Sequence, residues 1–376
     1  MADPNAWRIS ALDTTAEEVG YDPSRILRLQ EIFERLVSQG KIQGAAYSLS
    51  RHGHLFADAS IGKRHHEGSA PLETTTWRCI ASVTKVLTTM GLLKLVEDGR
   101  IVMEFPVANF LSEFDTPSHG KIRLQHLLAH TSGIRPDPGS DGEPNPDHQS
   151  YWALLQEPDW VSRFVALPLS NAPGVVWRYS SAGFALLGEV IARTVGEPYA
   201  RWMEREILVP AGLTDTFFDT KDRSLDRFSY VSDGDRAFIE KRPLWVDQSR
   251  MALGHAYSTT RDLVRLGHLL ASGGTIDGVR ILGRRTVEAM TSLQVEVPAP
   301  HWGDHFPDWR YGLGLEPARH PLLRTGSVWG HEGSGRCAMW FDPETGLVAS
   351  FILPTTIDWD PDFGWTPRAV IWSGLK

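Results

Sequence analysis

The chain is poor in several features that mark common classes of protein. It has two cysteines, Cys79 and Cys337, in 376 residues, which excludes a disulfide framework and fits a reducing compartment. It has no run of basic residues, and its net charge of −8 argues against nucleic acid as a partner. No apolar stretch is long enough to span a membrane, and the start, MADPNAWRIS, lacks the regions of a signal peptide. If this N-terminus is native, we expect a cytoplasmic protein without a membrane partner.

Two catalytic motifs are also missing. No Gly-x-Ser-x-Gly occurs, so the nucleophile elbow of α/β-hydrolases is excluded. The stretch HEGSG (331–335) lacks the second histidine of His-Glu-x-x-His. Histidine pairs could in principle bind a metal, but no cysteine or carboxylate cluster joins them, so we expect no metal and no other cofactor. These pairs are His52/His54, His65/His66 and His301/His305.

The hydrophobic content of 41% is enough for a large core, as one domain or two lobes. Pro, Gly and Asp dominate residues 135–159, which predicts a loop and a candidate lid. Helices are predicted on both sides of this loop, and strands near both ends of the chain. The predicted elements are a helix from Asp22-Pro23 through Gln39, a hairpin at 44–62 turning near His52-Gly53, a short helix in 121–134, helices from Trp160 to about Leu208, a helix at 258–274 with Ser258 as N-cap, and strands at 336–342 and 346–354. Four tryptophans in loop-like stretches are candidates to line an apolar pocket: Trp302, Trp309, Trp359 and Trp365.

Five of the eight lysines have a serine three residues upstream, so Ser-x-x-Lys spacing alone decides nothing. Two such side chains share one face only in a helix. Four of the pairs enclose a glycine, which disfavours a helix. The remaining pair, Ser82 and Lys85, opens a largely apolar segment that ends at Gly99. We therefore predict a buried helix with Ser82 at its N-terminus.

That geometry suits nucleophilic catalysis. A serine hydroxyl needs a neighbour to take its proton, and burial lowers the pKa of a lysine so that it can do so. The helix N-terminus adds N–H groups that favour an oxyanion. The plainer interpretation is that Ser82 is an N-cap and Lys85 a side chain that reaches solvent.

Three later segments decide between these interpretations: HLLAHTSGI (126–134), PGVVWRYSSAG (173–183) and WGHEGSG (329–335). Together with CIASVTKVLT (79–88), in this order, they resemble the serine β-lactamase and penicillin-binding-protein-like superfamily, in the class C branch that includes esterases and D-aminopeptidases. LVPAGLTDT (208–216) and AYSTTRDLVRLGHLL (256–270) add to a resemblance that spans nearly the whole chain.

The resemblance implies a role for each matching residue. Ser82 would be the nucleophile, Lys85 its base partner, and Tyr179, in the Tyr-x-Asn position, a proton relay. His331 to Gly333 would take the place of Lys-Thr-Gly on a strand at the sheet edge. The backbone N–H groups of Ser82 and Ser334 would form the oxyanion hole. Arg324, in RTG (324–326), is a lesser candidate for the Lys-Thr-Gly position, and His130 is expected to be a structural hydrogen-bonding residue.

Two departures from the family pattern point away from β-lactams. Ser181 replaces the asparagine that holds a substrate amide, and His331 replaces a lysine that grips a carboxylate. The short spacing to FDP (341–343) also resembles the carboxylesterase members. The resemblance therefore favours a serine hydrolase that forms an acyl-enzyme from a small or aromatic ester. Amide hydrolysis as in a D-aminopeptidase, acyl transfer, weak β-lactamase activity and a catalytically silent binding protein remain open.

The fold that the resemblance implies is α+β. An antiparallel sheet flanked by helices would come from residues 1–95 and 250–376, and a mostly helical domain from residues 96–249. The site would lie between them and take a small-molecule ester or amide.

Overall fold

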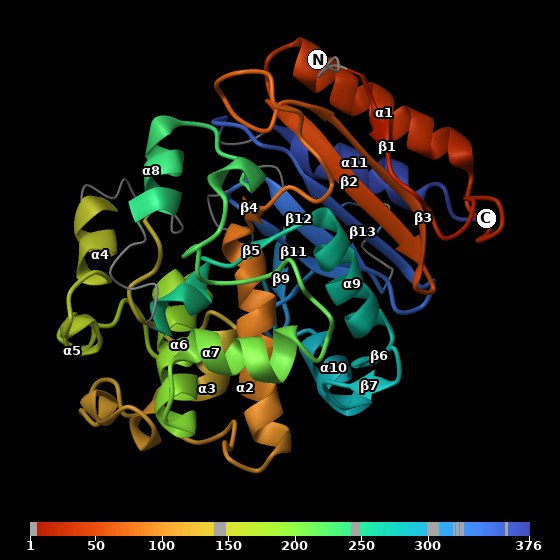
Figure 1. The fold of residues 1–376 in the computed structure, drawn as a ribbon. Helices are drawn as coiled ribbons and strands as arrows, with labels where there is room; N and C mark the ends of the chain where they lie inside the picture. The colour runs from red at the N-terminus through yellow and green to blue at the C-terminus, as the bar shows by residue number, and fades with distance from the viewer. Residues whose placement is uncertain are drawn as a thin grey trace.

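The computed structural model describes residues 6–138, 148–241, 249–298, 308–318, 320, 323, 327–357 and 360–376. Its centre is a seven-stranded antiparallel sheet, in which strands from the two ends of the chain lie side by side (Figure 1). The order is β1 (Arg8–Ile9), β3 (His54–Gly62), β2 (Gly44–Arg51), β13 (Leu347–Ile352), β12 (Cys337–Phe341), β11 (Trp329–Gly333) and β10 (Glu316–Pro317). The predicted antiparallel sheet is therefore confirmed.

The hairpin of β2 and β3 shows how local sequence sets this register. Arg51 pairs with His54, so the connecting loop has two residues, His52 and Gly53. Both have positive φ, 51° and 86°, as a type I′ turn requires, and glycine adopts that conformation without strain. The predicted turn at His52-Gly53 is confirmed.

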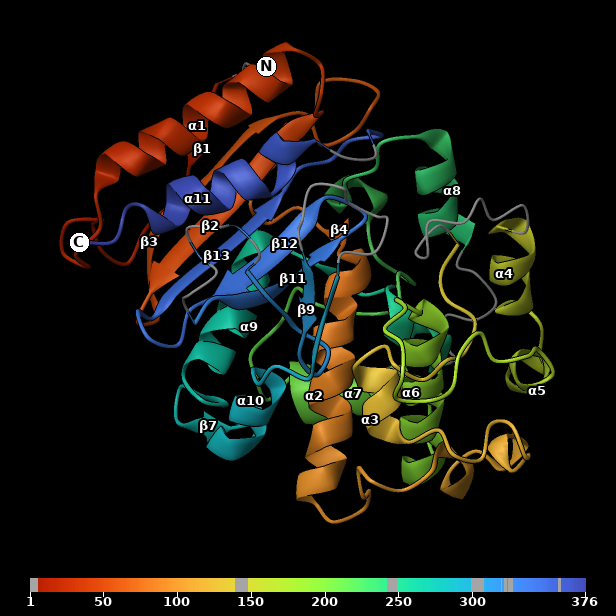
Figure 2. The same ribbon diagram turned by 180° about the vertical axis from the view of Figure 1, so that it is seen from behind.

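Helices cover both faces of the sheet (Figure 2). On one face, α1 (Pro23–Ser38) lies beside α11 (Trp365–Trp372), and the apolar side chains of α1 pack into a core with those of β2 and β12. The N-cap of α1 is Asp22, whose carboxylate accepts a hydrogen bond from the Ser24 N–H. On the other face, α9 (Thr260–Ala271) packs against β13, β12 and β2.

The rest of the chain is mostly helical and packs below the sheet in Figure 1. At its centre is α2 (Thr84–Glu97), which contacts α6 (Ser181–Val195) and is buried from Thr84 to Leu93. The other helices are α3 (Leu124–Leu128), α4 (His148–Leu154), α5 (Trp160–Val165), α7 (Tyr199–Met203) with a π-helical extension (Glu204–Leu208), α8 (Asp233–Lys241), the 3-10 helix η6 (Ser249–Leu253) and α10 (Arg284–Met290). The domain boundaries near residues 95 and 250 stay a prediction.

Short strand pairs complete the described chain: β4 (Arg78–Cys79) with β5 (Tyr257–Ser258), β6 (Thr275–Ile276) with β7 (Val279–Arg280), and β8 (Val295–Pro298) with β9 (Asp308–Tyr311). No helix in the described ranges is long and apolar enough to cross a bilayer.

Two local predictions were wrong. The N-cap of α9 is Thr259, whose hydroxyl accepts from the Asp262 N–H, whereas Ser258 ends β5. The predicted loop at 135–159 contains α4, so helix starts before Trp160. Residues 139–147 of that loop lie outside the described part of the chain, as do Trp302, Trp359, Arg324, His301 and His305.

Candidate active site

The side chains of Ser82 and Lys85 lie on the same face of one helical segment, as predicted. Ser82 belongs to a 3-10 turn (Ala81–Val83) that leads directly into α2, and its side chain is partly exposed. Lys85, in the first turn of α2, is fully buried. Its Nζ lies 3.1 Å from Ser82 Oγ, so a reachable hydroxyl is hydrogen-bonded to a buried amine.

The surroundings of Lys85 use all three of its N–H groups. Besides Ser82, Nζ donates to Ser181 Oγ at 3.3 Å and to the Leu253 carbonyl of η6 at 2.6 Å. Burial lowers the pKa of Lys85 from 10.5 to about 8, and the charge of Asp137 opposes this shift. Lys85 can therefore lose its proton near neutral pH, which an exposed lysine does not do.

We expect the rate of acylation to rise with pH through about 8. Only neutral Lys85 can accept the Ser82 proton, and below its pKa the neutral fraction grows about tenfold per pH unit. The measurement is kcat/KM for an uncharged ester between mildly acid and alkaline pH. A flat profile from a folded enzyme with chemistry rate-limiting contradicts this role.

Tyr179 lies beside the same amine. It immediately precedes Ser180, the N-cap of α6, and its ring centroid is 4.9 Å from Lys85 Nζ. It is 7% exposed and packs with three other aromatic side chains. These are Trp177, Trp309 and Tyr311. Of the tryptophans predicted to line a pocket, Trp309 belongs to the same aromatic cluster as the predicted relay residue and contacts Trp177, and Trp365 begins α11.

His130 holds the backbone next to Tyr179. Its Nδ1 accepts a hydrogen bond from the Ser180 N–H at 3.1 Å, and its ring lies 4.3 Å from the Tyr179 ring. Burial, with the nearby charge of Lys85, keeps the pKa of His130 well below its usual range. The prediction of a structural hydrogen-bonding role is confirmed, and His130 is neutral at working pH.

His331 is buried on β11 and forms hydrogen bonds through both ring nitrogens. Nδ1 donates to the backbone carbonyl of Glu332 at 2.7 Å, and Nε2 lies 3.1 Å from the Tyr311 hydroxyl. The neighbouring Glu332 carboxylate points to the opposite face of the strand, where it pairs with Arg368 at 3.1 Å.

Gly333 brings β11 against the backbone that precedes Ser82. A Cβ at Gly333 would lie 2.3 Å from the Ile80 carbonyl oxygen, so only glycine fits there. Ser334 follows in the exposed turn between β11 and β12. This close approach supports the predicted oxyanion hole of the Ser82 and Ser334 N–H groups, which stays a prediction.

Two residues of the site have no signal in the sequence. Asp137 Oδ1 accepts from the Ser181 N–H and from the Tyr151 hydroxyl, and Oδ2 accepts from Ser181 Oγ, each at 2.6 Å. Tyr151 also accepts from the Ala182 N–H at 3.0 Å. Asp137 lies in the segment predicted to be a loop and a candidate lid, and Tyr151 lies on the unpredicted helix α4.

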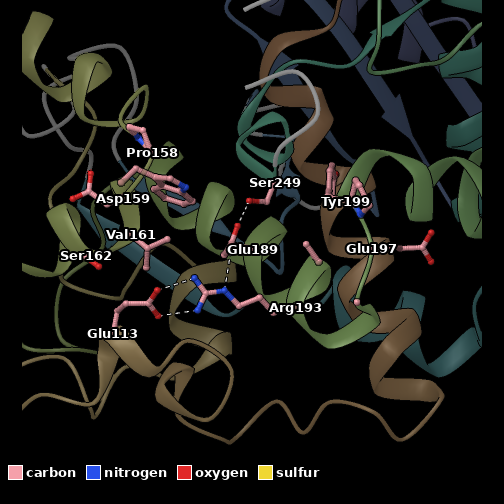
Figure 3. A pocket seen from close by; sticks show the side chains of 14 residues that line it. Glu113, Pro158, Asp159, Val161, Ser162, Glu189, Arg193, Glu197, Tyr199 and Ser249 are labelled. Atoms are coloured by element: carbon pink, nitrogen blue, oxygen red, sulfur yellow. Dashed lines mark hydrogen bonds and ion pairs between the residues drawn. The ribbon is translucent and has the colours of Figure 1, made fainter. Parts of the chain in front are cut away.

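A cavity of about 520 Å³ lies elsewhere, in the helical region (Figure 3). Its lining includes Trp160, Glu189, Arg193 and Tyr199 and contains none of the predicted site residues. Arg193 is already bonded to Glu113 and Glu189. Since neither Ser82 nor Lys85 lines this cavity, it is not the candidate active site.

One group in the described part of the chain has the composition of a metal site. His66, Glu67 and Asp233 offer ligand atoms within 4.8 Å of one another. Both carboxylates are exposed, and His66 Nε2 lies 3.2 Å from Asp233 Oδ1, a contact that is ordinary at a protein surface without a metal.

The fold and the site together define a serine hydrolase. The chain belongs to the beta-lactamase family, whose profile matches residues 29–362. Protein Rv1367c of Mycobacterium tuberculosis strain H37Rv is 26% identical over an alignment of 363 residues that covers 86% of this chain and 88% of that protein. Esterase EstB of Burkholderia gladioli is 28% identical over 57% of this chain and 54% of its own length. Among solved structures, EstCE1, a hydrolase with promiscuous acyltransferase activity, has a TM-score of 0.77 at 20% identity and covers 93% of this chain and 99% of its own.

Proposed function

We propose that this protein is a carboxylesterase that forms an acyl-enzyme on Ser82. The observation that carries the proposal is the 3.1 Å hydrogen bond between the partly exposed Ser82 hydroxyl and the fully buried Lys85 amine. Neutral Lys85 takes the proton as Ser82 Oγ attacks the ester carbonyl. The N–H groups of Ser82 and Ser334 bind the oxyanion. Tyr179, beside Lys85, relays a proton to the leaving alcohol, and water then releases the acid.

The groups available for substrate recognition favour esters over β-lactams. The Ser181 hydroxyl donates to Asp137 and accepts from Lys85, so it offers no amide-like donor to a substrate. His331 bonds Tyr311 and a backbone carbonyl, and unlike the lysine that it replaces, a histidine is not a fixed positive charge for a carboxylate. An esterase among the relatives, EstB, adds support.

Acyl transfer to an alcohol is the second candidate. It uses the same acyl-enzyme, with an alcohol in the place of water. The partial exposure of Ser82 leaves the acyl group open to either acceptor, and EstCE1 is described as a hydrolase with promiscuous acyltransferase activity. Product analysis with and without added alcohol separates the two.

A fluorophosphonate probe followed by mass spectrometry tests the proposal. It reports a nucleophilic serine without knowledge of the natural substrate, so labelling at Ser82 is the expected result. A folded protein that is not labelled, or is labelled at another serine, contradicts the proposal and favours a silent binding protein.

We expect a short-chain p-nitrophenyl ester to exceed nitrocefin by at least tenfold in kcat/KM. A tenfold ratio corresponds to about 1.4 kcal/mol of transition-state preference. The reason is that Ser181 and His331 replace the two residues that bind the amide and the carboxylate of a β-lactam. The oxyanion donors, by contrast, can bind any acyl group. Both substrates are measured on one preparation, with Ser82→Ala as the background. A tenfold advantage for nitrocefin means that Ser181 and His331 do bind the lactam.

A further inference from the structure

Asp137 is a buried carboxylate in an unusual setting. It is 8% exposed, and its hydrogen-bond donors are the neutral N–H and hydroxyl of Ser181 and the hydroxyl of Tyr151. In the ranges that the structure describes, no lysine or arginine forms an ion pair with it. A buried carboxylate without a direct cation is costly, so its position calls for a second charge nearby.

That second charge is Lys85, and Ser181 connects the two. Ser181 Oγ donates its hydrogen to Asp137 Oδ2, which leaves its lone pairs for Lys85 Nζ at 3.3 Å. The four groups form one chain, from Ser82 Oγ through Lys85 Nζ and Ser181 Oγ to Asp137 Oδ2. Without Asp137, the Ser181 hydroxyl would be free to turn its hydrogen toward the neutral amine and to occupy the lone pair that must accept the Ser82 proton.

We propose that Asp137 is a positioning residue which fixes Ser181 as an acceptor for Lys85 and supplies the negative charge that balances the ammonium formed when Ser82 is deprotonated. This inference rests on the proposed function and extends it to a residue that nothing in the family motifs marks. The proton moves from Ser82 Oγ to Lys85 Nζ.

The charges around Lys85 support this assignment. Asp137 is the group that raises the pKa of Lys85 against the effect of burial. The other titratable groups facing Lys85 are His130, after α3, and His255, after η6, together with the Tyr179 ring. Burial lowers the pKa of His255 to about 3, and that of His130 lies well below its usual range, so both are neutral in the working range. Asp137 is therefore the carboxylate whose charge acts on Lys85.

The test is Asp137→Asn, a variant of equal size without the charge. The measurement is the rate of fluorophosphonate inactivation against pH, with thermal unfolding to verify the fold. Because Asp137 raises the pKa of Lys85, its removal moves the inflection to lower pH, by about one unit. The alkaline plateau falls about tenfold, because the ammonium formed during attack loses its stabilising charge.

Two control variants separate charge from packing. Tyr151→Phe removes one hydrogen bond to the same carboxylate but keeps the charge, so the inflection stays at the wild-type pH. Asp159→Asn makes the same chemical change at the N-cap of α5, where the carboxylate pairs with Arg163 on the surface, and leaves the whole profile unchanged.

An unshifted or upward-shifted inflection in Asp137→Asn overturns the inference, as does an equal shift in Tyr151→Phe. If Asp137→Asn does not fold, Ser181→Ala decides: a wild-type plateau in that variant overturns the inference, and a roughly tenfold lower one supports it. A wild-type protein that is not labelled at Ser82 rejects the proposed function itself. Labelling at Ser82 with an unmoved inflection rejects only the role of Asp137.

Discussion

Ser82→Ala is expected to abolish fluorophosphonate labelling and to lower kcat/KM for an ester by at least about 10³-fold, because it removes the hydroxyl that would form the acyl-enzyme. The fold should persist. The Ser82 side chain is partly exposed, and its hydrogen bond in the described structure is the one from Lys85. Loss of a partly exposed hydroxyl creates no cavity in the core. The measurements are esterase assay, labelling and thermal unfolding on one preparation.

The chain offers a matched control for this variant. Ser118 also precedes a lysine, Lys121, by three residues, but it lies in a loop and bonds its neighbour His119. Ser118→Ala should keep wild-type activity and labelling. Ester hydrolysis at the wild-type rate by Ser82→Ala would place the nucleophile elsewhere and remove the basis of the proposed function.

The contrast between Ser82 and Ser118 shows which part of the site can be predicted from sequence. A hydrogen bond between residues three apart depends on local helix geometry. That geometry can be predicted from the positions of glycines and from the apolar content of the segment. The burial of Lys85 follows from the apolar residues around it on α2. The same reasoning predicted the β2–β3 turn at His52-Gly53, since two residues with positive φ fix it.

Contacts between distant segments could not be predicted in this way. Asp137 reaches Ser181 across 44 residues, and its surroundings in the sequence are rich in Pro, Gly and Asp, which predict only a loop. Its function depends on where that loop folds back, and a single sequence has no local pattern for this. Tyr151 was missed for the same reason, since its partner lies on another element.

The error at the N-cap of α9 also comes from a contact between distant segments. Ser258 and Thr259 are both good N-caps, and the structure selects Thr259 because Ser258 is paired in β5. Strand pairing with a distant segment thus decided where the helix begins.

Lys85→Ala is expected to lower kcat/KM by about 10³-fold, and added primary amines should restore part of the loss. The variant removes the base and leaves a buried space, where a small amine can take the place of Nζ beside Ser82 Oγ and the Leu253 carbonyl. If the lysine acts as a base, the rescued rate follows the concentration of the neutral amine. The measurement is the rate at several pH values with methylamine and ethylamine.

A matched lysine on the same helix provides the control. Lys94 lies at the C-terminal end of α2, partly exposed and 4.0 Å from Asp98, so Lys94→Ala should retain activity and show no response to amines. Lys85→Arg sharpens the test, because arginine keeps the positive charge but does not accept a proton near neutral pH. A folded Lys85→Arg enzyme with wild-type activity would assign Lys85 an electrostatic role alone. Inactivity of Lys85→Arg together with amine rescue of Lys85→Ala establishes proton transfer from Ser82 to Lys85 as the step that the buried amine performs.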